Sequence, residues 1–260
     1  MGKNKLKKFA EMETIPLVFQ YPFARLKQET FPLKACWNSD FFHNQNPIIL
    51  ELGCGKGEYS VGLATRFPDK NFIGFDIKGA RMHTGACQAR DNDLGNVAFV
   101  RTSIELLDNF FSPGEVDEIW ITFPDPQMKK ATKRLTGTRF IDLYRRVLKP
   151  GGIIHLKTDS PFLYQYTRMM ARHNNLEIIS DISDVYAQED QNSVLRTIRT
   201  HYEQQWLDRG LTIKYLSFRP GQDTILSEPP EAEELQPDTY RSYSRGYIQC
   251  PQLLDDEQEN

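Results

Sequence analysis

The stretch IILELGCGKGEYSVGLATRFPDKNFIGFD, residues 48–76, restricts the possible fold more than any other part of the sequence. Its first five residues, 48–52, are mostly apolar and too few for a helix, so they predict a strand buried on both faces. Apolar residues at helical spacing follow within 59–67, and a second apolar run occupies 71–75. This order is a βαβ unit, which predicts an α/β sheet with a ligand at the carboxyl ends of its strands.

Three glycines and two acids mark the ligand end of this unit. Gly53, Gly55 and Gly57 directly follow the first predicted strand, where glycine lets a ligand lie close to the backbone. Glu51 and Asp76 end the two strands, and carboxylates suit a hydroxylated or cationic ligand. The spacing G-x-G-x-G differs from the G-x-G-x-x-G of dinucleotide sites and is similar to motif I of S-adenosylmethionine-dependent methyltransferases. We therefore predict a nucleoside cofactor bound by these five residues; the alternative is that the glycines only form a tight turn.

The rest of the chain continues the alternation of strands and helices. Further short apolar runs predict strands at 97–101, 116–122, 153–157, 176–179 and 213–218. Helical spacing and capping residues predict helices at 79–92, 140–148, 160–170 and 200–210. We predict an α/β fold with a Rossmann-like, doubly wound, mostly parallel sheet of seven strands.

Charge and composition divide the chain into three parts. Residues 1–46 are interpreted as an N-terminal arm and capping segment, 47–222 as the catalytic domain, and 223–260 as an acidic tail expected to be disordered. The formal net charge of the chain is −3. The tail contains ten acidic residues and two arginines, so residues 1–222 carry +5. Because the tail has no site motif, we expect catalysis to survive its removal.

The composition does not support several classes of protein. No apolar run approaches the roughly 20 residues that span a bilayer, and the N-terminus lacks a signal-peptide core. The four cysteines contain no C-x-x-C pair and the five histidines are dispersed, so neither a disulfide framework nor a metal site is predicted. We expect a cytoplasmic protein without a metal, either a monomer or a homodimer.

A single carboxylate follows the predicted strand 116–122. Asp125 lies between Pro124 and Pro126, which fix the backbone on both sides. The carboxyl end of this strand faces the same crevice as the two acids of the βαβ unit, so Asp125 is a candidate catalytic residue. The alternative is a P-D-P turn on the surface.

Basic residues are concentrated just after this turn, at Lys129, Lys130, Lys133, Arg134 and Arg139. Such a run is usually a solvated surface, but beside a candidate active site it favours contact with a phosphate backbone. The loop 129–134 is therefore the predicted polyanion contact.

Two T-x-x-E patterns predict capping boxes at the starts of short helices. They are Thr102–Glu105 and Thr200–Glu203, in which threonine caps the helix and glutamate returns a hydrogen bond. From the residues alone, both pairs have a structural role.

Five segments together resemble one enzyme family: ELGCGKGEYS, GFDIK, ITFPDPQMKKATKRL, HLKTDSPF and RTHYEQQWLDRG. Their order and approximate spacing are similar to those of bacterial tRNA (guanine-N7-)-methyltransferases, and the resemblance covers residues 2–218. It implies transfer of a methyl group from S-adenosylmethionine to N7 of a guanine in the tRNA variable loop. Guanine N7 carries no proton at neutral pH, so this chemistry needs alignment rather than a general base.

The resemblance also implies roles for particular residues. Asp125 matches the catalytic centre and a cofactor contact, and Thr102 matches the pocket wall beside the cofactor. The substrate-binding positions match Lys129, Asp159, Thr200 and Glu203. Many members have tryptophan after P-D-P, where this chain has Gln127, so a stacking surface is either missing or supplied elsewhere.

Two other functions are consistent with the same scaffold. One is an S-adenosylmethionine-dependent methyltransferase of a protein or small molecule, which the basic loop and the T-x-Y-E pattern disfavour. The other is an RNA-binding protein without turnover, in which Glu51 and Asp76 would have no task.

Overall fold

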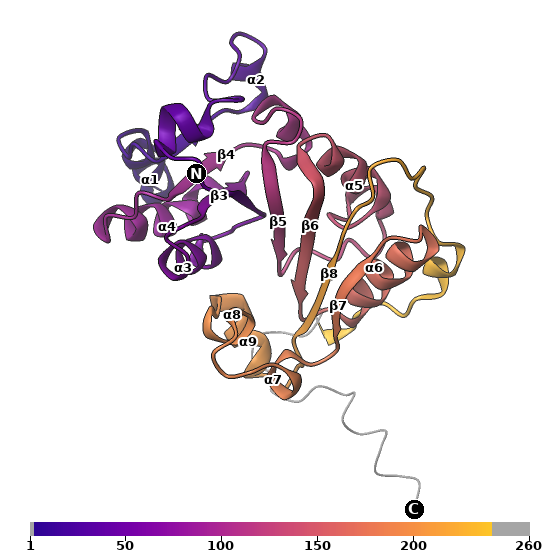
Figure 1. Ribbon diagram of the computed structural model, residues 1–260. Coiled ribbons are helices and arrows are strands. Elements are labelled where there is room, and N and C mark those ends of the chain that lie inside the picture. Colours follow the sequence, from indigo (N-terminus) through magenta and orange to yellow (C-terminus); the bar gives the residue numbers. More distant parts are fainter. Residues whose placement is uncertain (1–2, 241–260) are drawn as a thin grey trace, which may run out of the picture.

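An eight-stranded sheet forms the centre of the protein in the computed structural model, which describes residues 3–240 (Figure 1). The strand order is β1-β4-β3-β2-β5-β6-β8-β7. Each pairing among β1 to β6 is parallel, whereas β8 is antiparallel to both β6 and β7. The strands span Val18–Gln20 (β1), Ile48–Leu52 (β2), Asn71–Asp76 (β3), Val97–Arg101 (β4), Val116–Thr122 (β5), Leu148–Thr158 (β6), Ile178–Ile182 (β7) and Lys214–Phe218 (β8).

The predicted mostly parallel α/β sheet is confirmed, with one strand more than expected. β2, β4 and β5 have the predicted bounds, and β3 extends by one residue to Asp76. The additional strand, β1, comes from the predicted N-terminal arm and pairs with β4, where Val18 lies opposite Phe99. β6 begins at Leu148 rather than Ile153, and a register shift in its pairing with β5 accommodates the extra residues.

Helices cover both faces of the sheet, with α3 and α4 on one face and α5 and α6 on the other (Figure 1). The α-helices span Lys3–Glu13 (α1), Phe23–Leu26 (α2), Glu58–Arg66 (α3), Gly79–Asp91 (α4), Thr138–Arg145 (α5), Pro161–His173 (α6), Val185–Gln188 (α7), Val194–Thr197 (α8) and His201–Leu207 (α9). Shorter helical turns are the π-helix η1 (Trp37–Phe42) and the 3-10 helices η2 (Ile104–Asn109), η3 (Ala131–Lys133) and η4 (Pro230–Glu234).

Two hydrophobic clusters, one on each face of the sheet, hold these layers together. Successive strand residues point to opposite faces, so Leu50 and Leu52 belong to one cluster and Ile49 to the other. All five residues of β2 are buried, as predicted. The N-terminal aromatics complete the first cluster, where Trp37 donates its indole N–H to the carbonyl of Phe110 at 3.0 Å.

Of the two predicted capping boxes, one forms and the other does not. Thr200 and Glu203 form theirs at the start of α9, as predicted. Thr102 does not cap η2, because this helix begins at Ile104 and the residue before it is Ser103, whose side chain makes no capping hydrogen bond. The N–H of Thr102 bonds to the carbonyl of Asp76 in the neighbouring strand, at 3.2 Å. Glu105 instead forms an ion pair with Lys133 at 2.8 Å.

The chain after β8 returns across the domain. We define the C-terminal segment as residues 219–240; it passes α5 and α6 in Figure 1. Glu228 accepts hydrogen bonds from the hydroxyls of Thr138 and Tyr166, both at 2.6 Å. Residues 223–240 belong to the tail that was expected to be disordered; most of them are exposed, but Glu228, Asp238 and Tyr240 are hydrogen-bonded to the domain. Residues 241–260 lie outside the described residues.

Candidate active site

A cavity of about 460 Å³ opens at the carboxyl ends of β2, β3 and β5. β2 lies between β3 and β5 in the sheet, so this crevice forms where the strand order reverses, the usual ligand position in such sheets. Six of the predicted site residues line the cavity together: Glu51, Gly53, Gly55, Asp76, Asp125 and Thr200. The structure thus brings the cofactor motif, the P-D-P turn and the start of α9 to one place.

The glycine loop forms one wall of the cavity. Gly53 and Gly55 have φ values of 81° and 57°, a region that favours glycine. A Cβ atom on Gly53 would meet nothing closer than Leu135 at 3.9 Å, so the backbone is bare toward the cavity. Gly57 has another role, because a Cβ there would lie 2.6 Å from the ring of Phe99. Gly57 does not line the cavity; it permits close packing of α3 against β4 and α4.

Glu51 connects three elements beneath the cavity. Its carboxylate accepts hydrogen bonds from the backbone N–H of Ser60 at 2.8 Å and from the hydroxyl of Thr122 at 2.6 Å. These bonds tie the end of β2 to α3 and to β5. Burial raises the pKa of Glu51 to about 7. Because both carboxylate oxygens already have partners, Glu51 organises the floor of the cavity.

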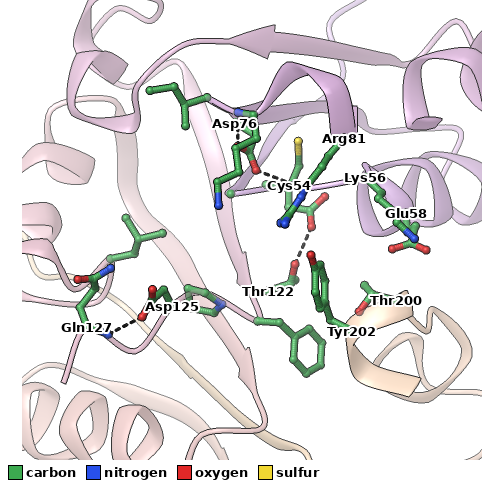
Figure 2. Close-up of a pocket in the computed structure, with 18 of the residues that line it drawn as sticks. Cys54, Lys56, Glu58, Asp76, Arg81, Thr122, Asp125, Gln127, Thr200 and Tyr202 are labelled. Carbon is green, nitrogen blue, oxygen red and sulfur yellow. Dashed lines mark hydrogen bonds between the residues drawn. The ribbon is translucent and has the colours of Figure 1, made fainter. Parts of the chain in front are cut away.

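Asp76 supports the glycine loop from the end of β3. One carboxylate oxygen accepts the N–H of Gly55 at 2.9 Å and the other accepts the N–H of Lys78 at 2.6 Å. Figure 2 shows this side chain at the rim of the pocket. A carboxylate oxygen can accept more than one hydrogen bond, so Asp76 can also bind ligand hydroxyls.

Asp125 is exposed on the opposite side of the cavity, in a turn of unusual backbone geometry. Phe123 and Gln127 have φ values of 48° and 49°, which non-glycine residues seldom adopt. The Asp125 carboxylate accepts the backbone N–H of Gln127 at 3.1 Å, which closes the turn (Figure 2). Strained backbone of this kind is concentrated at functional sites. The turn therefore presents Asp125 in a fixed position.

Thr102 is next to Asp76, a residue of the cavity wall, but does not itself line the cavity. Its side chain is buried, and its hydroxyl has no hydrogen-bond partner among the described residues. Thr102 therefore does not line the pocket that holds the other cofactor candidates.

α9 supplies the wall that faces the glycine loop. Its start is attached to α3, because the N–H of His201 donates to the Glu58 carboxylate at 3.1 Å. Tyr202 points from α9 into the pocket, and the guanidinium of Arg81 lies 5.6 Å from the centre of its ring (Figure 2). Trp206, one turn later, also lines the cavity. α9 therefore places two aromatic side chains opposite the P-D-P turn.

Two of the predicted substrate-binding residues are fully buried and cannot touch a large substrate directly. Glu203 has no exposed surface and lies 2.8 Å from the Nζ of Lys157, itself fully buried. Asp159 also has no exposed surface, and it accepts a hydrogen bond from the Tyr240 hydroxyl at 2.6 Å.

The basic residues of the loop 129–134 fall into two groups, those bound to other parts of the protein and those exposed to solvent. Arg134 is buried, lies 4.3 Å from the ring centre of Tyr166, and donates to the carbonyl of Met128 at 2.9 Å. Lys133 is neutralised by its ion pair with an η2 glutamate. Lys129 and Lys130 are exposed and form no ion pair among the described residues. These two lysines are the positive charges available to a polyanion.

Sequence reasoning missed Tyr202, Trp206 and Arg81. Tyr202 and Trp206 lie in the predicted helix 200–210, to which the sequence alone assigns only a structural role. Arg81 carried a usable signal, since it lies in the first turn of the helix after Asp76, at the same sheet edge. Within residues 3–240, no cluster of three or more His, Cys, Asp or Glu could hold a metal, and no helix is long and apolar enough to cross a bilayer.

Known proteins are similar to this chain at two levels, in sequence over most of its length and in fold alone. A family described as a putative methyltransferase matches residues 45–216. A tRNA (guanine-N(7)-)-methyltransferase of Porphyromonas gingivalis is 60% identical over 236 residues, covering 90% of this chain and 96% of that protein. The protein with the same name from Bacteroides thetaiotaomicron is 55% identical over 245 residues, covering 94% and 96%.

A solved structure shares the scaffold at much lower identity. The 16S rRNA methyltransferase KamB matches with a TM-score of 0.54 and 13% identity, covering 79% of this chain and 94% of that one. This likeness concerns the fold alone.

Proposed function

The chain belongs to the family of tRNA (guanine-N(7)-)-methyltransferases, and we propose that it transfers a methyl group from S-adenosylmethionine to N7 of a guanine in the variable loop of tRNA. The observation that carries this proposal is the shared cavity, in which a bare glycine backbone, Asp76 and Asp125 face the aromatic side chains of α9. A cofactor and a planar base can lie side by side in such a site.

The cofactor side of the cavity has suitable chemistry for S-adenosylmethionine. Gly53 and Gly55 leave space against the backbone, and Asp76 offers acceptors for ribose hydroxyls. Glu51 places a buried carboxyl group below the same wall. When bound, S-adenosylmethionine supplies an electrophilic methyl group next to the substrate base.

Asp125 is the proposed catalytic residue. Its carboxylate can accept hydrogen bonds from N1–H and N2–H of guanine, which would orient the base. Positive charge develops on the ring as N7 is alkylated, and a fixed carboxylate stabilises that charge. The turn that closes on Gln127 holds Asp125 in place for both tasks.

The aromatic residues of α9 are the proposed stacking surface for the base. Gln127 occupies the position where many family members have tryptophan, so the P-D-P turn has no aromatic side chain there. Tyr202 and Trp206 line the opposite wall. Bases drawn out of folded RNA commonly stack on such side chains. Lys129 and Lys130 would contact the phosphates, and Thr200 lies at the rim as the remaining predicted substrate contact.

One experiment tests the proposal directly. Purified protein is incubated with unmodified tRNA and labelled S-adenosylmethionine, and the modified nucleotide is then mapped by cleavage at N7-methylguanosine. We expect one labelled guanine in the variable loop. Label on protein, on small molecules or on another RNA position would favour a different methyltransferase, and tRNA binding with neither label transfer nor cofactor binding would favour a non-catalytic RNA-binding protein.

A further inference from the structure

The end of the C-terminal segment contacts Trp206, which lines the cavity, and the loop that carries Asp125. Asp238 is buried at the start of α6, where its carboxylate accepts the backbone N–H of Phe162 at 3.1 Å and bonds to the hydroxyl of Ser160. Its own backbone N–H lies 3.0 Å from the sulfur of Met128. Asp238 thus links α6 to the loop that carries Asp125.

Tyr240 makes a second connection to the same wall. It is 4% exposed, and its hydroxyl donates to the buried carboxylate of Asp159 at 2.6 Å. Its ring meets that of Trp206 edge to face, with centroids 5.4 Å apart. Trp206 lines the cavity, so Tyr240 lies directly behind one of the two aromatic side chains proposed to stack on the base.

The segment is also fixed along its length. Glu228 bonds to Thr138 at the start of α5 and to Tyr166 on α6. The Asn174 side chain donates to the Ser227 carbonyl at 2.9 Å and accepts the Ser227 N–H at 2.8 Å. These contacts deliver residues 238–240 to the pocket wall in a defined position.

We propose that the C-terminal segment is a structural part of the substrate site, in which Tyr240 and Asp238 are positioning residues for the guanine-binding wall. Tyr240 sets the position of Trp206 and bonds to Asp159, while Asp238 steadies the loop of Asp125 and Lys129. This inference rests on the proposed function. It also reverses the expectation that the acidic tail is dispensable for catalysis, and it gives the buried Asp159 a task.

A different role for the segment predicts the opposite kinetic effect. If Tyr240 merely covered Asp159 and had to leave when RNA binds, its removal would lower KM for tRNA. The buried carboxylate of Asp238 favours positioning, because its departure would leave the N–H of Phe162 and the hydroxyl of Ser160 without the acceptor that Asp238 supplies. The sign of the KM change separates the two roles.

The test compares four full-length chains: the parent, Ile225→Ala, Tyr240→Ala and Tyr240→Phe. Ile225 is 94% exposed in the same segment, so Ile225→Ala is the control and we expect parent-like kinetics. Tyr240→Ala should raise KM for tRNA or lower kcat by at least about tenfold, because small displacements of positioning groups are costly. Tyr240→Phe keeps the ring against Trp206, so we expect it to recover most of that loss. The Kd for S-adenosylmethionine should stay within twofold throughout.

Two further measurements keep the result interpretable. Thermal unfolding shows whether Tyr240→Ala is folded; if it is not, Tyr240→Leu, which fills part of the space of the ring but has neither the aromatic edge nor the hydroxyl, takes its place with the same expected result. The indole N–H resonance of Trp206, recorded without RNA, should shift in Tyr240→Ala and stay near its parent position in Tyr240→Phe. An unmoved resonance with kinetics within twofold of the parent, or a lower KM, would overturn the inference. A parent chain that fails to methylate tRNA, while the resonance still shifts, would instead refute the proposed function.

Discussion

The ammonium of Lys157 and the carboxylate of Glu203 form an ion pair of 2.8 Å from which solvent is fully excluded. Lys157 comes from β6, and Glu203 also closes the capping box of α9. Burial lowers the pKa of Lys157, and the neighbouring Glu203 opposes that shift. The pair therefore attaches the wall that carries Tyr202 and Trp206 to the sheet.

Removing one partner of this pair should destabilise the protein. Glu203→Gln leaves the ammonium of Lys157 buried without a counter-charge, and we expect the free energy of unfolding to fall by about 3–5 kcal/mol. Urea denaturation measures the loss. Gln204→Ala, on the exposed side of the same helix, is the control and should stay within about 0.5 kcal/mol. Unchanged stability with a raised KM for tRNA would instead indicate direct substrate contact by Glu203.

Asp76 should be needed for cofactor affinity. Asp76→Ala removes acceptors for ribose hydroxyls and the support of Gly55, so we expect binding of S-adenosylmethionine to weaken by about 1–3 kcal/mol. Calorimetry with the purified protein measures this change. Asp69→Asn, an exposed acid in the turn before β3, is the matched control. Equal affinity in the two variants would rule out a cofactor role for Asp76.

Asp125→Asn should reduce the chemical step. The amide keeps the shape of the carboxylate but loses its charge and one acceptor oxygen, so we expect kcat to fall about 10²–10³-fold. Cofactor affinity should change little because the glycine loop and Asp76 remain. Single-turnover methyl transfer at saturating tRNA and cofactor isolates this step. A rate within a few-fold of the parent would leave Asp125 as a surface turn residue.

Lys129 and Lys130 should account for part of the salt dependence of tRNA binding. Replacing both with alanine removes two phosphate contacts, and each loss should flatten the log–log slope of affinity against salt by about 0.7–0.9. Lys149→Ala is the control, because this lysine pairs with Asp117 at 2.7 Å near the start of β6. Identical slopes for parent and double variant would mean that the loop is only a solvated surface.

Glu51 should make stability depend on pH. Its pKa is raised from 4.5 to about 7 in the folded protein, so the folded state keeps a proton that the unfolded state has lost between these values. The stabilisation is therefore complete below pH 4.5 and is lost as pH rises through 7, by about 3 kcal/mol in all. Glu51→Gln lacks this dependence. Unfolding of both proteins from pH 5 to 8 should show the parent losing stability relative to the variant; parallel curves would contradict the assignment.

The central sheet was predictable because its strands are short apolar runs bounded by turns. The same logic missed β1, whose three residues lie among prolines and aromatics and are only half-buried. It also placed Gly57 in the cofactor site, although its close contact with Phe99 comes from packing between distant elements. Spacing identifies a glycine-rich turn, but it does not show which glycines face the ligand.

The two T-x-x-E patterns show that a local sequence pattern alone does not determine whether a capping box forms. Thr200 and Glu203 form a capping box that is reinforced by Lys157, a partner from another element. Glu105 has two cations within reach, at Lys133 and Arg139, and binds them instead. The burial of Tyr240 could not be predicted from the sequence either, because its partner Asp159 lies far away in the sequence and the residues around Tyr240 are mostly acidic or polar.

The position of β8 sets the order in which the sheet can be completed on the ribosome. β8 lies between β6 and β7, and β7 pairs with no other strand among the described residues. β7 therefore emerges before its only neighbour, and it must wait for residues 214–218 while the segment carrying α7, α8 and α9 is synthesised. The glycine-loop half of the sheet needs no such delay, because β2, β3, β4 and β5 are all present before β6. The glycine-loop half can thus form before β6 is synthesised, whereas the edge formed by β7 and β8 is completed only after residues 214–218 have emerged.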